Sequence, residues 1–419
     1  MAHLNSAGWE NTGDAEQADL IIVNSCGFIE SAKQESINAV LEWRKIYPNK
    51  KILLAGCLAQ RYKKELSEEL KEADGFMGVE DTAKIVEAAT KVVAAIPAAI
   101  SANVAVGDRP LLSLPGSAYV KISEGCNNNC SYCAIPMIRG SLVCRKIPDI
   151  VDECRALLAR GIKELCIIGQ DIGAHDGLSI LLNTLSMLKG DFWVRLLYIH
   201  PDHFPLEILD LMESDGRFLP YFDIPFQHAS EKILTAMNRS GTAEKYLELI
   251  NTIRARCFSN KQLPNAVIRS TFLLGFPGET EEDFEALLDF QQKAKLDWLG
   301  CFTYSREEGT PAFSMKGQVP AKIAQARKQI IEERQIPITE KNMDRFTDLT
   351  LDVLIEEQFI SEADKNEENL WLGRLYCQAP EIDGAAVIIS EKEAKDLKPG
   401  TLTQCKVIAR RGFDLEVRV

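Results

Sequence analysis

Six short runs of apolar and β-branched residues recur through the middle of the chain, separated by polar stretches with helical periodicity. Residues 148–161 and 280–294 show this helical pattern, and Thr280 is the expected N-cap of the second helix. The alternation predicts a parallel sheet covered by helices, and six runs rather than eight predict a partial barrel. The runs are AYVKIS (118–123), ELCIIG (164–169), WVRLLYIH (193–200), YFDIPFQ (221–227), AVIRSTFLLGF (266–276) and WLGCFTYS (298–305).

The two ends of the chain carry different patterns. QADLIIVNSCGFIES (17–31) and KKILLAGCLAQRY (50–62) each predict a buried strand that runs into a helix, as in an N-terminal parallel α/β domain. Residues 320–345 predict a long polar linker helix that is broken near Pro337. Five short strands follow and predict a small C-terminal β-barrel. We therefore expect an α/β protein with domains at 1–100, 112–340 and 341–419.

Polar residues follow each predicted strand of the central pattern. In parallel α/β folds the active site lies at these carboxyl ends of the strands. Gly275 and Gly278 would let the backbone approach a ligand, although GFPGE could equally be a simple strand-to-helix turn. Gln227 and His228 could contact a ligand or serve the structure. The residues are Cys126–Cys133 after the first strand, Gln170 and Asp171 after the second, His200 and Asp202 after the third, Gln227 and His228 after the fourth, Gly275–Glu279 after the fifth, and Tyr304 and Ser305 at the end of the sixth.

The composition of the chain favours some classes of protein over others. The 419 residues contain no run of 18 apolar residues and no signal-peptide pattern, so we expect a cytoplasmic protein without a membrane partner. Without a secretory signal, twelve cysteines favour metal binding or ordinary burial over disulfides. The net charge of −13 argues against nonspecific nucleic-acid binding and permits a basic protein partner.

The stretch EGCNNNCSYC (124–133) places three cysteines close together. A structural zinc site usually takes four Cys or His ligands as two separated pairs, and Cys144 could complete such a set. An iron–sulfur cluster fits better, because three thiolates leave one iron open to a small molecule. Cys26 and Cys57 each follow an N-terminal strand, so they are either two small buried thiols or, as we favour, parts of a shared metal site.

The spacing CxxxCxxC, with Tyr132 before the last cysteine, resembles the signature of radical S-adenosylmethionine (SAM) enzymes. With NSCGFIESA, AGCLAQRY, IRGSLVCR, PFQHAS, RSTFLLGFPGETEEDF and LGCFTYSREEGTPA, it makes nearly the whole chain similar to the radical SAM methylthiotransferases. The resemblance implies an N-terminal α/β domain, a radical SAM partial (β/α)6 barrel and a C-terminal TRAM β-barrel. It also implies that one SAM donates a methyl group and that another is reductively cleaved to a 5′-deoxyadenosyl radical.

The resemblance further implies the cofactor sites. Cys126, Cys130 and Cys133 would hold the [4Fe-4S] cluster that cleaves SAM, and Cys26 and Cys57 would ligate a second, auxiliary [4Fe-4S] cluster. We expect Gln170, Gln227, Gly275, Gly278 and Glu279 to bind the cofactor, and we assign no catalytic residue beyond the cluster ligands.

The start of the chain departs from the family. The family has an earlier strand that ends in a GC motif and supplies the first auxiliary cysteine, but no cysteine precedes Cys26 here. MAHLNSAGW is typical of the end of a helix, so we expect an N-terminal domain that is truncated at its start. The chain therefore supplies two of the three cysteines that ligate the family's auxiliary cluster. Sulfur insertion is the step that this departure affects.

The C-terminal barrel resembles TRAM domains, which often bind RNA. Residues 341–419 hold 11 Lys and Arg residues against 16 Asp and Glu residues, whereas an RNA-binding module normally shows a basic stripe. The acidic segment APEIDG resembles that of the RimO branch, which modifies an aspartate β-carbon of a small-subunit ribosomal protein. We therefore expect Glu381 and Asp383 to bind this basic substrate.

The sequence leaves two alternative functions open and predicts several partners. The chain could instead be a tRNA adenosine methylthiotransferase of the MiaB branch, or a non-catalytic, cluster-bearing protein that docks on the ribosome. As a methylthiotransferase we expect it to act as a monomer, to need an electron donor, and to meet the ribosomal protein alone or within the ribosome.

Overall fold

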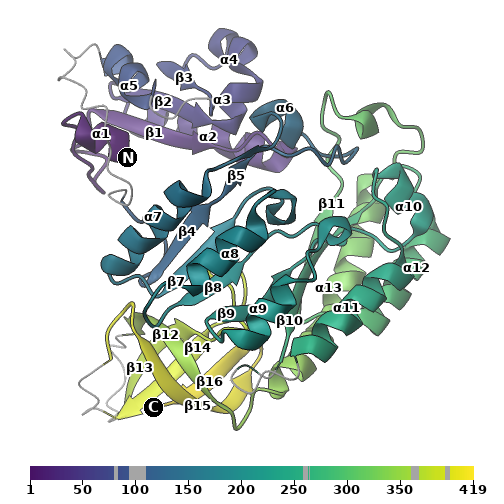
Figure 1. Ribbon diagram of the computed structural model, residues 1–419. Coiled ribbons are helices and arrows are strands. Elements are labelled where there is room, and N and C mark those ends of the chain that lie inside the picture. Colours follow the sequence, from purple (N-terminus) through teal and green to yellow (C-terminus); the bar gives the residue numbers. More distant parts are fainter. Residues whose placement is uncertain (80–83, 94–109, 258–262, 264, 360–367, 392–396) are drawn as a thin grey trace. The chain divides into compact units, whose positions relative to one another are not determined.

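The computed structural model describes residues 1–419 except 80–83, 94–109, 258–262, 264, 360–367 and 392–396 (Figure 1). The chain divides into two compact units. Unit 1 comprises residues 1–111, 124–143 and 305–315, and unit 2 comprises residues 112–123, 144–304 and 316–419. The predicted domain boundary at residue 100 lies outside the described residues. The boundaries at 112 and 340 stay predictions, because the two units follow spatial contact rather than contiguous sequence.

Unit 1 is built on a three-stranded parallel sheet in the order β1-β2-β3. Its strands are β1 (Leu20–Ser25), β2 (Lys51–Gly56) and β3 (Gly75–Met77). Its helices are α1 (Ala2–Ser6), α2 (Glu30–Ile46), α3 (Cys57–Arg61), α4 (Lys63–Glu69), α5 (Ile85–Val93), α6 (Ile135–Arg139) and the short 3-10 helix η4 (Pro311–Ser314). The register pairs Ser25 with Gly56, so β1 and β2 end level with each other. Both predicted strands and the helix beginning at Glu30 are confirmed.

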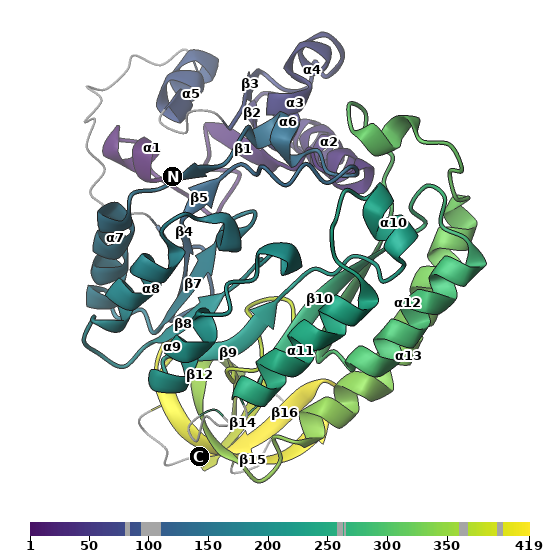
Figure 2. The same ribbon diagram turned by 45° about the vertical axis from the view of Figure 1, so that its right-hand side comes forward.

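Unit 2 contains a six-stranded parallel sheet in the order β11-β10-β9-β8-β7-β4, which confirms the predicted partial barrel. Helices α7, α8, α9, α11 and α12 lie along one face of it (Figure 2). The strands are β4 (Ser117–Lys121), β7 (Glu164–Ile168), β8 (Trp193–Leu196), β9 (Phe218–Asp223), β10 (Val267–Leu274) and β11 (Trp298–Thr303). The helices are α7 (Ile147–Ala159), α8 (Leu178–Ser186), α9 (Ile208–Ser214), α10 (Glu231–Ala236), α11 (Ala243–Cys257), α12 (Glu281–Ala294) and α13 (Ala321–Asp344), with 3-10 helices η2 (Ile172–Ala174) and η3 (Pro201–His203). Two-residue strands β5 (Ser123–Glu124) and β6 (Val143–Cys144) flank the cysteine loop in the sequence.

Two details of the sequence prediction were wrong. Strand β9 ends at Asp223 rather than at Gln227, because Pro225 has no N–H for the ladder and Gln227 keeps only an isolated bridge to Phe272. Helix α13 continues through Pro337 without a break. Pro337 lies on the exposed side of the helix, and Thr339 bonds the carbonyl of Asp297, so tertiary contacts outweigh the missing hydrogen bond.

The C-terminal segment forms the predicted barrel, closed in the order β12-β13-β14-β16-β15. Its strands are β12 (Thr350–Phe359), β13 (Glu368–Arg374), β14 (Ala386–Glu391), β15 (Leu402–Arg411) and β16 (Asp414–Arg418). Trp193 and Tyr221 of the parallel sheet share one hydrophobic core with Val353, Leu375 and Val417 of the barrel. The barrel and the sheet are therefore packed as one body within unit 2.

A buried ionic network reinforces this packing. The carboxylate of Glu164, at the start of β7, accepts hydrogen bonds from Arg374 of β13 at 2.6 Å and from Arg195 of β8 at 2.7 Å. Ser117 donates a third hydrogen bond at 2.7 Å. Burial alone would raise the pKa of Glu164, but the charges of Arg374 and Arg195 outweigh it and lower the pKa to about 2. Glu164 is thus a fully buried carboxylate whose partners come from both the sheet and the barrel.

Candidate functional site

The three-cysteine loop belongs to unit 1 and is held by its own backbone. The amide of Cys126 donates to the carbonyl of Gly140 at 3.3 Å, and that of Cys133 donates to the carbonyl of Cys130 at 3.0 Å. Gly125 has φ +75°, and a Cβ there would lie 2.2 Å from the carbonyl oxygen of Ser141. The position directly before the first loop cysteine therefore requires glycine.

The donor set of the loop favours an iron–sulfur cluster over zinc, because three thiolates suit a cluster with one open iron whereas a structural zinc site takes four ligands. Within the described part of the chain, the one group of His, Cys, Asp and Glu ligand atoms that lie within 4.8 Å of one another is Cys144, His175 and Asp176, and it contains none of the three loop cysteines. Burial raises the pKa of Cys133 to about 12, and the neighbouring thiols add to this shift, so a cationic group is needed to hold the thiolate form.

Cys26 and Cys57 also meet within unit 1. Cys26 follows β1, and its amide donates to Ser36 Oγ of α2 at 3.1 Å. Cys57 begins α3 directly after β2. A Cβ on Gly27 would lie 2.7 Å from the carbonyl oxygen of Cys57 and 2.8 Å from the amide nitrogen of Leu58. The backbones that carry the two cysteines are therefore in direct contact, and a shared metal site there stays a prediction.

We expect Gly27→Ala to disturb this contact, because the new methyl group would meet backbone atoms that cannot rotate away. The change should lower the melting temperature and the iron bound per chain after anaerobic reconstitution. Gly13→Ala is the matched control, since a Cβ at Gly13 meets nothing within 4 Å. Equal iron content and equal melting temperatures for the two variants would contradict the expectation.

Within unit 1, the segment 305–315 contacts helices α2 and α3 through Glu307, a residue that was not predicted from the sequence. Its buried carboxylate pairs with Lys33 of α2 at 3.0 Å and with Arg61 of α3 at 2.8 Å. Arg61 also donates to the carbonyl of Gly27 at 2.9 Å. This ion cluster therefore fixes the helices that follow Cys26 and Cys57.

The carboxyl ends of the strands in unit 2 carry buried side-chain polar atoms that have no hydrogen-bond partner among the described residues, and one of them, His228 Nε2, lies 3.7 Å from Glu279 Oε2. They belong to consecutive strand ends: Ser123 Oγ, Gln170 Oε1, His200 Nε2 and His228 Nε2. Burial lowers the pKa of His200 to about 4, helped by Arg239, and lowers the pKa of His228 to about 3, so both imidazoles are neutral near pH 7. Buried polar atoms are normally paired, and this edge is therefore suited to a polar ligand. Ser123 was not predicted, because a serine inside an apolar run gives no distinct signal.

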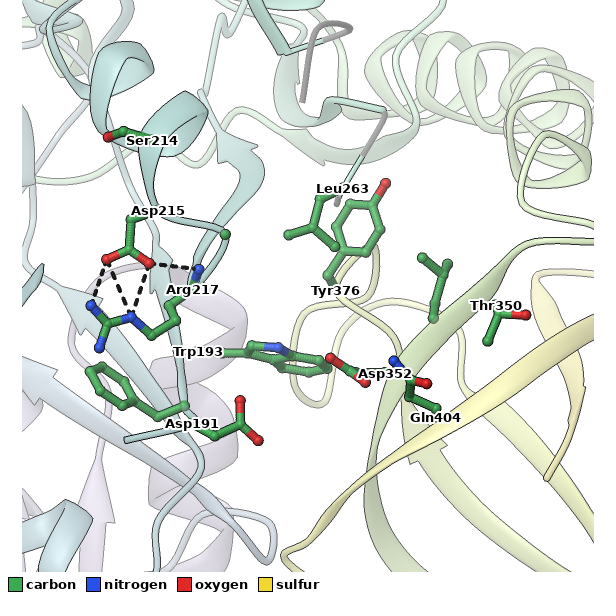
Figure 3. A pocket seen from close by; sticks show the side chains of 13 residues that line it. Asp191, Trp193, Ser214, Asp215, Arg217, Leu263, Thr350, Asp352, Tyr376 and Gln404 are labelled. Carbon is green, nitrogen blue, oxygen red and sulfur yellow. Dashed lines mark hydrogen bonds and ion pairs between the residues drawn. The ribbon is translucent and has the colours of Figure 1, made fainter. Parts of the chain in front are cut away.

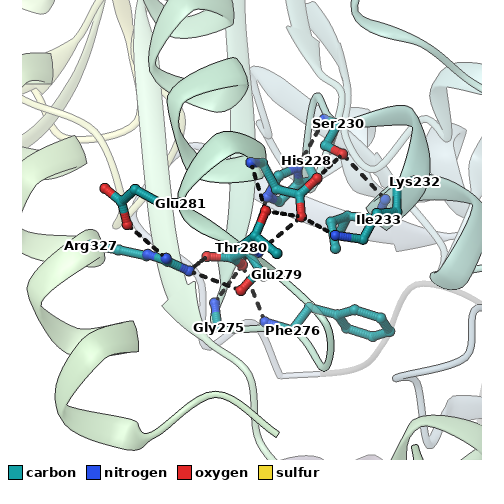
Figure 4. Close-up of polar contacts among 11 residues, drawn as sticks. His228, Ser230, Lys232, Ile233, Gly275, Phe276, Glu279, Thr280, Glu281 and Arg327 are labelled. Carbon is teal, nitrogen blue, oxygen red and sulfur yellow. Dashed lines mark hydrogen bonds and ion pairs between the residues drawn. The ribbon is translucent and has the colours of Figure 1, made fainter. Parts of the chain in front are cut away.

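The GFPGE turn has protein partners instead (Figure 4). Glu279 accepts from the amides of Gly275 at 2.7 Å and Phe276 at 3.2 Å and pairs with Arg327 at 2.7 Å. Thr280 caps α12 in a capping box with Asp283, which confirms the predicted N-cap. These contacts give the turn a structural role, and a cofactor contact by Gly275, Gly278, Glu279 or Gln227 stays a prediction.

The other predicted polar residues at these strand ends bond to the protein. Asp171 accepts from the amides of Gly173 at 3.1 Å and His200 at 3.2 Å, and Asp202 accepts from the amide of Ser240 at 2.9 Å. These carboxylates therefore shape the loops after β7 and β8.

Glu381 and Asp383 lie in different surroundings. The Asp383 carboxylate is buried, accepts from the Tyr221 hydroxyl at 2.6 Å and the Ala379 amide at 2.8 Å, and lies 3.6 Å from Arg269. Asp383 thus fixes the APEIDG loop against the parallel sheet. Glu381 is exposed and has φ +68°. Of the two residues predicted to bind the substrate, Glu381 is the one whose charge faces solvent.

Two further features do not coincide with the predicted site. A pocket of about 560 Å³, lined by Trp193, Tyr376 and Asp352 among others, lies at the starts of β8 and β12 rather than at their carboxyl ends (Figure 3). In the Cys144–His175–Asp176 group, His175 already accepts from Gly177 at Nδ1 and lies 3.3 Å from the Arg145 carbonyl at Nε2. Neither ring nitrogen is therefore open to a metal. Among the described helices, none is long and apolar enough to cross a bilayer.

Three families match successive parts of the chain. Residues 1–78 match the Uncharacterized protein family UPF0004, residues 120–290 the Radical SAM superfamily, and residues 349–419 the TRAM domain. A solved structure of the radical S-adenosylmethionine methyltransferase TsrM from Kitasatospora setae has a TM-score of 0.52 and 17% identity, covering 68% of this chain and 62% of that chain. At that identity the likeness shows the fold.

Curated relatives match over the full length. The ribosomal protein uS12 methylthiotransferase RimO of Treponema denticola is 46% identical over 99% of this chain and 95% of its own length. The protein of the same name from Aquifex aeolicus is 38% identical over 100% of this chain and 92% of its own length. The chain therefore belongs to the RimO family of radical SAM methylthiotransferases.

Proposed function

We propose that this chain replaces a β-hydrogen of an aspartate in ribosomal protein uS12 with a methylthio group. The observation that carries the proposal is the 46% identity to a uS12 methylthiotransferase over 99% of the chain. The β C–H bond of an aspartate has no useful acidity, so a general base cannot open it and radical chemistry is required. The tRNA and non-catalytic alternatives are not favoured by the relatives that match.

The residues of unit 1 would hold the metal groups. Cys126, Cys130 and Cys133 would ligate a [4Fe-4S] cluster, and Cys26 and Cys57 would supply two ligands of an auxiliary cluster. When bound, such clusters supply electron transfer to SAM and a place for the sulfur to be inserted. The chain's own contribution is to hold the thiolates in fixed backbone turns.

The residues of unit 2 would receive the polar groups of SAM. Ser123 Oγ, Gln170 Oε1 and His200 Nε2, which have no hydrogen-bond partner among the described residues, offer hydrogen bonds at consecutive strand ends. His228 Nε2, 3.7 Å from Glu279 Oε2, follows at the next strand end. The positive φ values of Gln227, Gly275 and Gly278 shape the loops that follow β9 and β10. We include Glu279 as the residue that keeps the Gly275 turn closed through its hydrogen bonds.

Mass spectrometry of uS12 tests the function. Reconstituted enzyme with SAM, sulfide and a reductant should add a methylthio group to one aspartate of uS12, whereas a digest of tRNA incubated in parallel should show no methylthiolated adenosine. A modified nucleoside with unmodified uS12 would overturn the proposal in favour of a tRNA enzyme. We expect a monomeric chain that acts in the cytoplasm, where ribosomes and a small protein electron donor are available.

We expect Glu381→Lys to weaken binding of uS12, because the change replaces an exposed acidic residue with a basic one, which repels a basic partner. A charge contact at an exposed rim contributes on the order of 1 kcal/mol or less, so the affinity should fall by about fivefold. Glu357→Lys, an identical charge change at an exposed position of β12, is the matched control. Binding measured by calorimetry should separate the two variants. Equal affinities would show that Glu381 does not face the substrate.

A further inference from the structure

One guanidinium lies between the two groups of cysteines in unit 1. Arg139 is the last residue of α6, six positions after Cys133 at the end of the cluster loop. Its Nη2 lies 3.4 Å from Cys57 Sγ, at a distance and geometry that qualify as a hydrogen bond to sulfur. Its Nη1 donates to Glu124 Oε1 on β5, two residues before Cys126. The same side chain therefore contacts a cysteine of the N-terminal sheet and the entry to the three-cysteine loop.

The backbone next to Arg139 makes a second connection. Gly140 follows it with φ +75°, and its carbonyl accepts from the Cys126 amide at 3.3 Å. The backbone directly after Arg139 therefore contacts the first loop cysteine. The geometry suits arginine, because two nitrogen atoms of a rigid planar fork engage two acceptors at once, which a lysine ammonium on a flexible stem cannot reproduce.

The contact between Arg139 and Cys57 also has an electrostatic consequence. Hydrogen bonds to ligand sulfur and positive charge nearby favour the reduced, more negative state of an iron–sulfur cluster. Arg139 is 27% exposed at its side chain, so solvent screens its charge only in part. Glu124 holds the guanidinium in place, and its own charge offsets part of the field.

We propose that Arg139 is a positioning residue that binds the Cys57 sulfur and raises the reduction potential of the cluster that Cys57 ligates. The inference rests on the proposed auxiliary cluster. It assigns a role to a residue outside both cysteine sets, and it gives the chain a direct link between the ligand of one cluster and the loop of the other.

The test compares Arg139→Gln and Arg139→Lys with the parent chain after anaerobic reconstitution. The readouts are iron per chain and an EPR-monitored redox titration that resolves each cluster. We expect Arg139→Gln to keep its iron and to shift the potential of the Cys57 cluster to a more negative value, with the other cluster less affected. In Arg139→Lys the potential should shift less than in Arg139→Gln, because lysine keeps the positive charge but lacks the planar, two-nitrogen guanidinium. Arg155→Gln is the control, since Arg155 is exposed on α7 and pairs with Asp152 of the same helix at 2.7 Å.

Two failures can be told apart. If the parent chain and Cys57→Ala hold the same iron, equal to one cluster, the auxiliary site is overturned and this role of Arg139 falls with it. If two clusters form and both potentials in Arg139→Gln equal those of the parent, the role of Arg139 alone is overturned. Should Arg139→Gln lose its fold by circular dichroism, the Arg139→Lys titration decides, because unchanged potentials and unchanged spectra there would equally contradict the contact.

Discussion

Cys130→Ala is expected to abolish SAM cleavage, and with it all methylthiolation. A cluster with one open iron needs all three thiolates of the loop, and Cys130 is the middle ligand between Cys126 and Cys133. The reconstituted variant should therefore lose about four irons per chain. Iron analysis and chromatography of 5′-deoxyadenosine measure the two effects, and production of 5′-deoxyadenosine at the parent rate would rule out this ligand set.

Cys144→Ala is the informative control for that result. Cys144 is the residue that could complete a zinc site with the three loop cysteines, and it is partly exposed. On the cluster assignment it is not a ligand, so Cys144→Ala should keep its iron and its SAM cleavage. Loss of the metal from Cys144→Ala as well would favour a four-thiolate zinc site instead.

Arg374→Met is expected to be the most destabilising substitution in unit 2 outside the hydrophobic core. It would leave the fully buried Glu164 with one guanidinium, that of Arg195, in place of two. Breaking a buried ion pair from one side costs about 3–5 kcal/mol, since the remaining charge stays desolvated. Urea denaturation should show this loss as a lower midpoint. Glu164→Gln should also lower the midpoint, because it leaves the buried guanidinium of Arg195 without its carboxylate partner.

An exposed pair on the same barrel is the control for Arg374. Arg411 of β15 pairs with Glu416 at 2.9 Å with its own side chain 75% exposed. Arg411→Met should therefore cost less than about 1 kcal/mol. Equal denaturation midpoints for the two variants would contradict the importance of the buried network.

The same network predicts a pH dependence with a definite sign. The folded state lowers the pKa of Glu164 from 4.5 to about 2, so the stability that its ionised form contributes is complete above pH 4.5 and is lost as the pH falls toward 2. The stability difference between the parent chain and Arg374→Met should accordingly shrink over this range. A difference that stays constant from pH 6 to pH 2 would show that Glu164 does not titrate there.

The sequence predicted most of the fold, because periodicity and capping act locally. All six sheet strands, the barrel strands and the Thr280 cap follow from side chains a few residues apart. The error at β9 came from Pro225, whose missing N–H ends a ladder that apolar character alone would continue. The continuous helix through Pro337 depends on contacts with Asp297, far away in the sequence, which no local pattern contains.

The site was less predictable, because its contacts join distant segments. APEIDG is visibly acidic, but the burial of Asp383 depends on Tyr221, 162 residues earlier. The strand-end rule found Gln170 and His200, whose unpaired atoms match the expectation of a polar edge. Arg139 and Glu307 had no signal, since an arginine at a helix end and a glutamate in a loop are ordinarily solvated, and only the folded chain shows which partners they contact.

The ion cluster of Glu307 also constrains how the protein is made. Glu307 lies 246 residues after Arg61, and the three-cysteine loop comes between them. At translation rates of about 5–20 residues per second, the nascent chain would wait roughly 12–50 s between synthesis of Arg61 and arrival of its carboxylate partner. During that interval the cysteines leave the ribosome before their unit can close. Because Cys26, Cys57 and the cysteines of residues 126–133 all precede Glu307, unit 1 can complete this ion cluster only after all five cysteines have been synthesised.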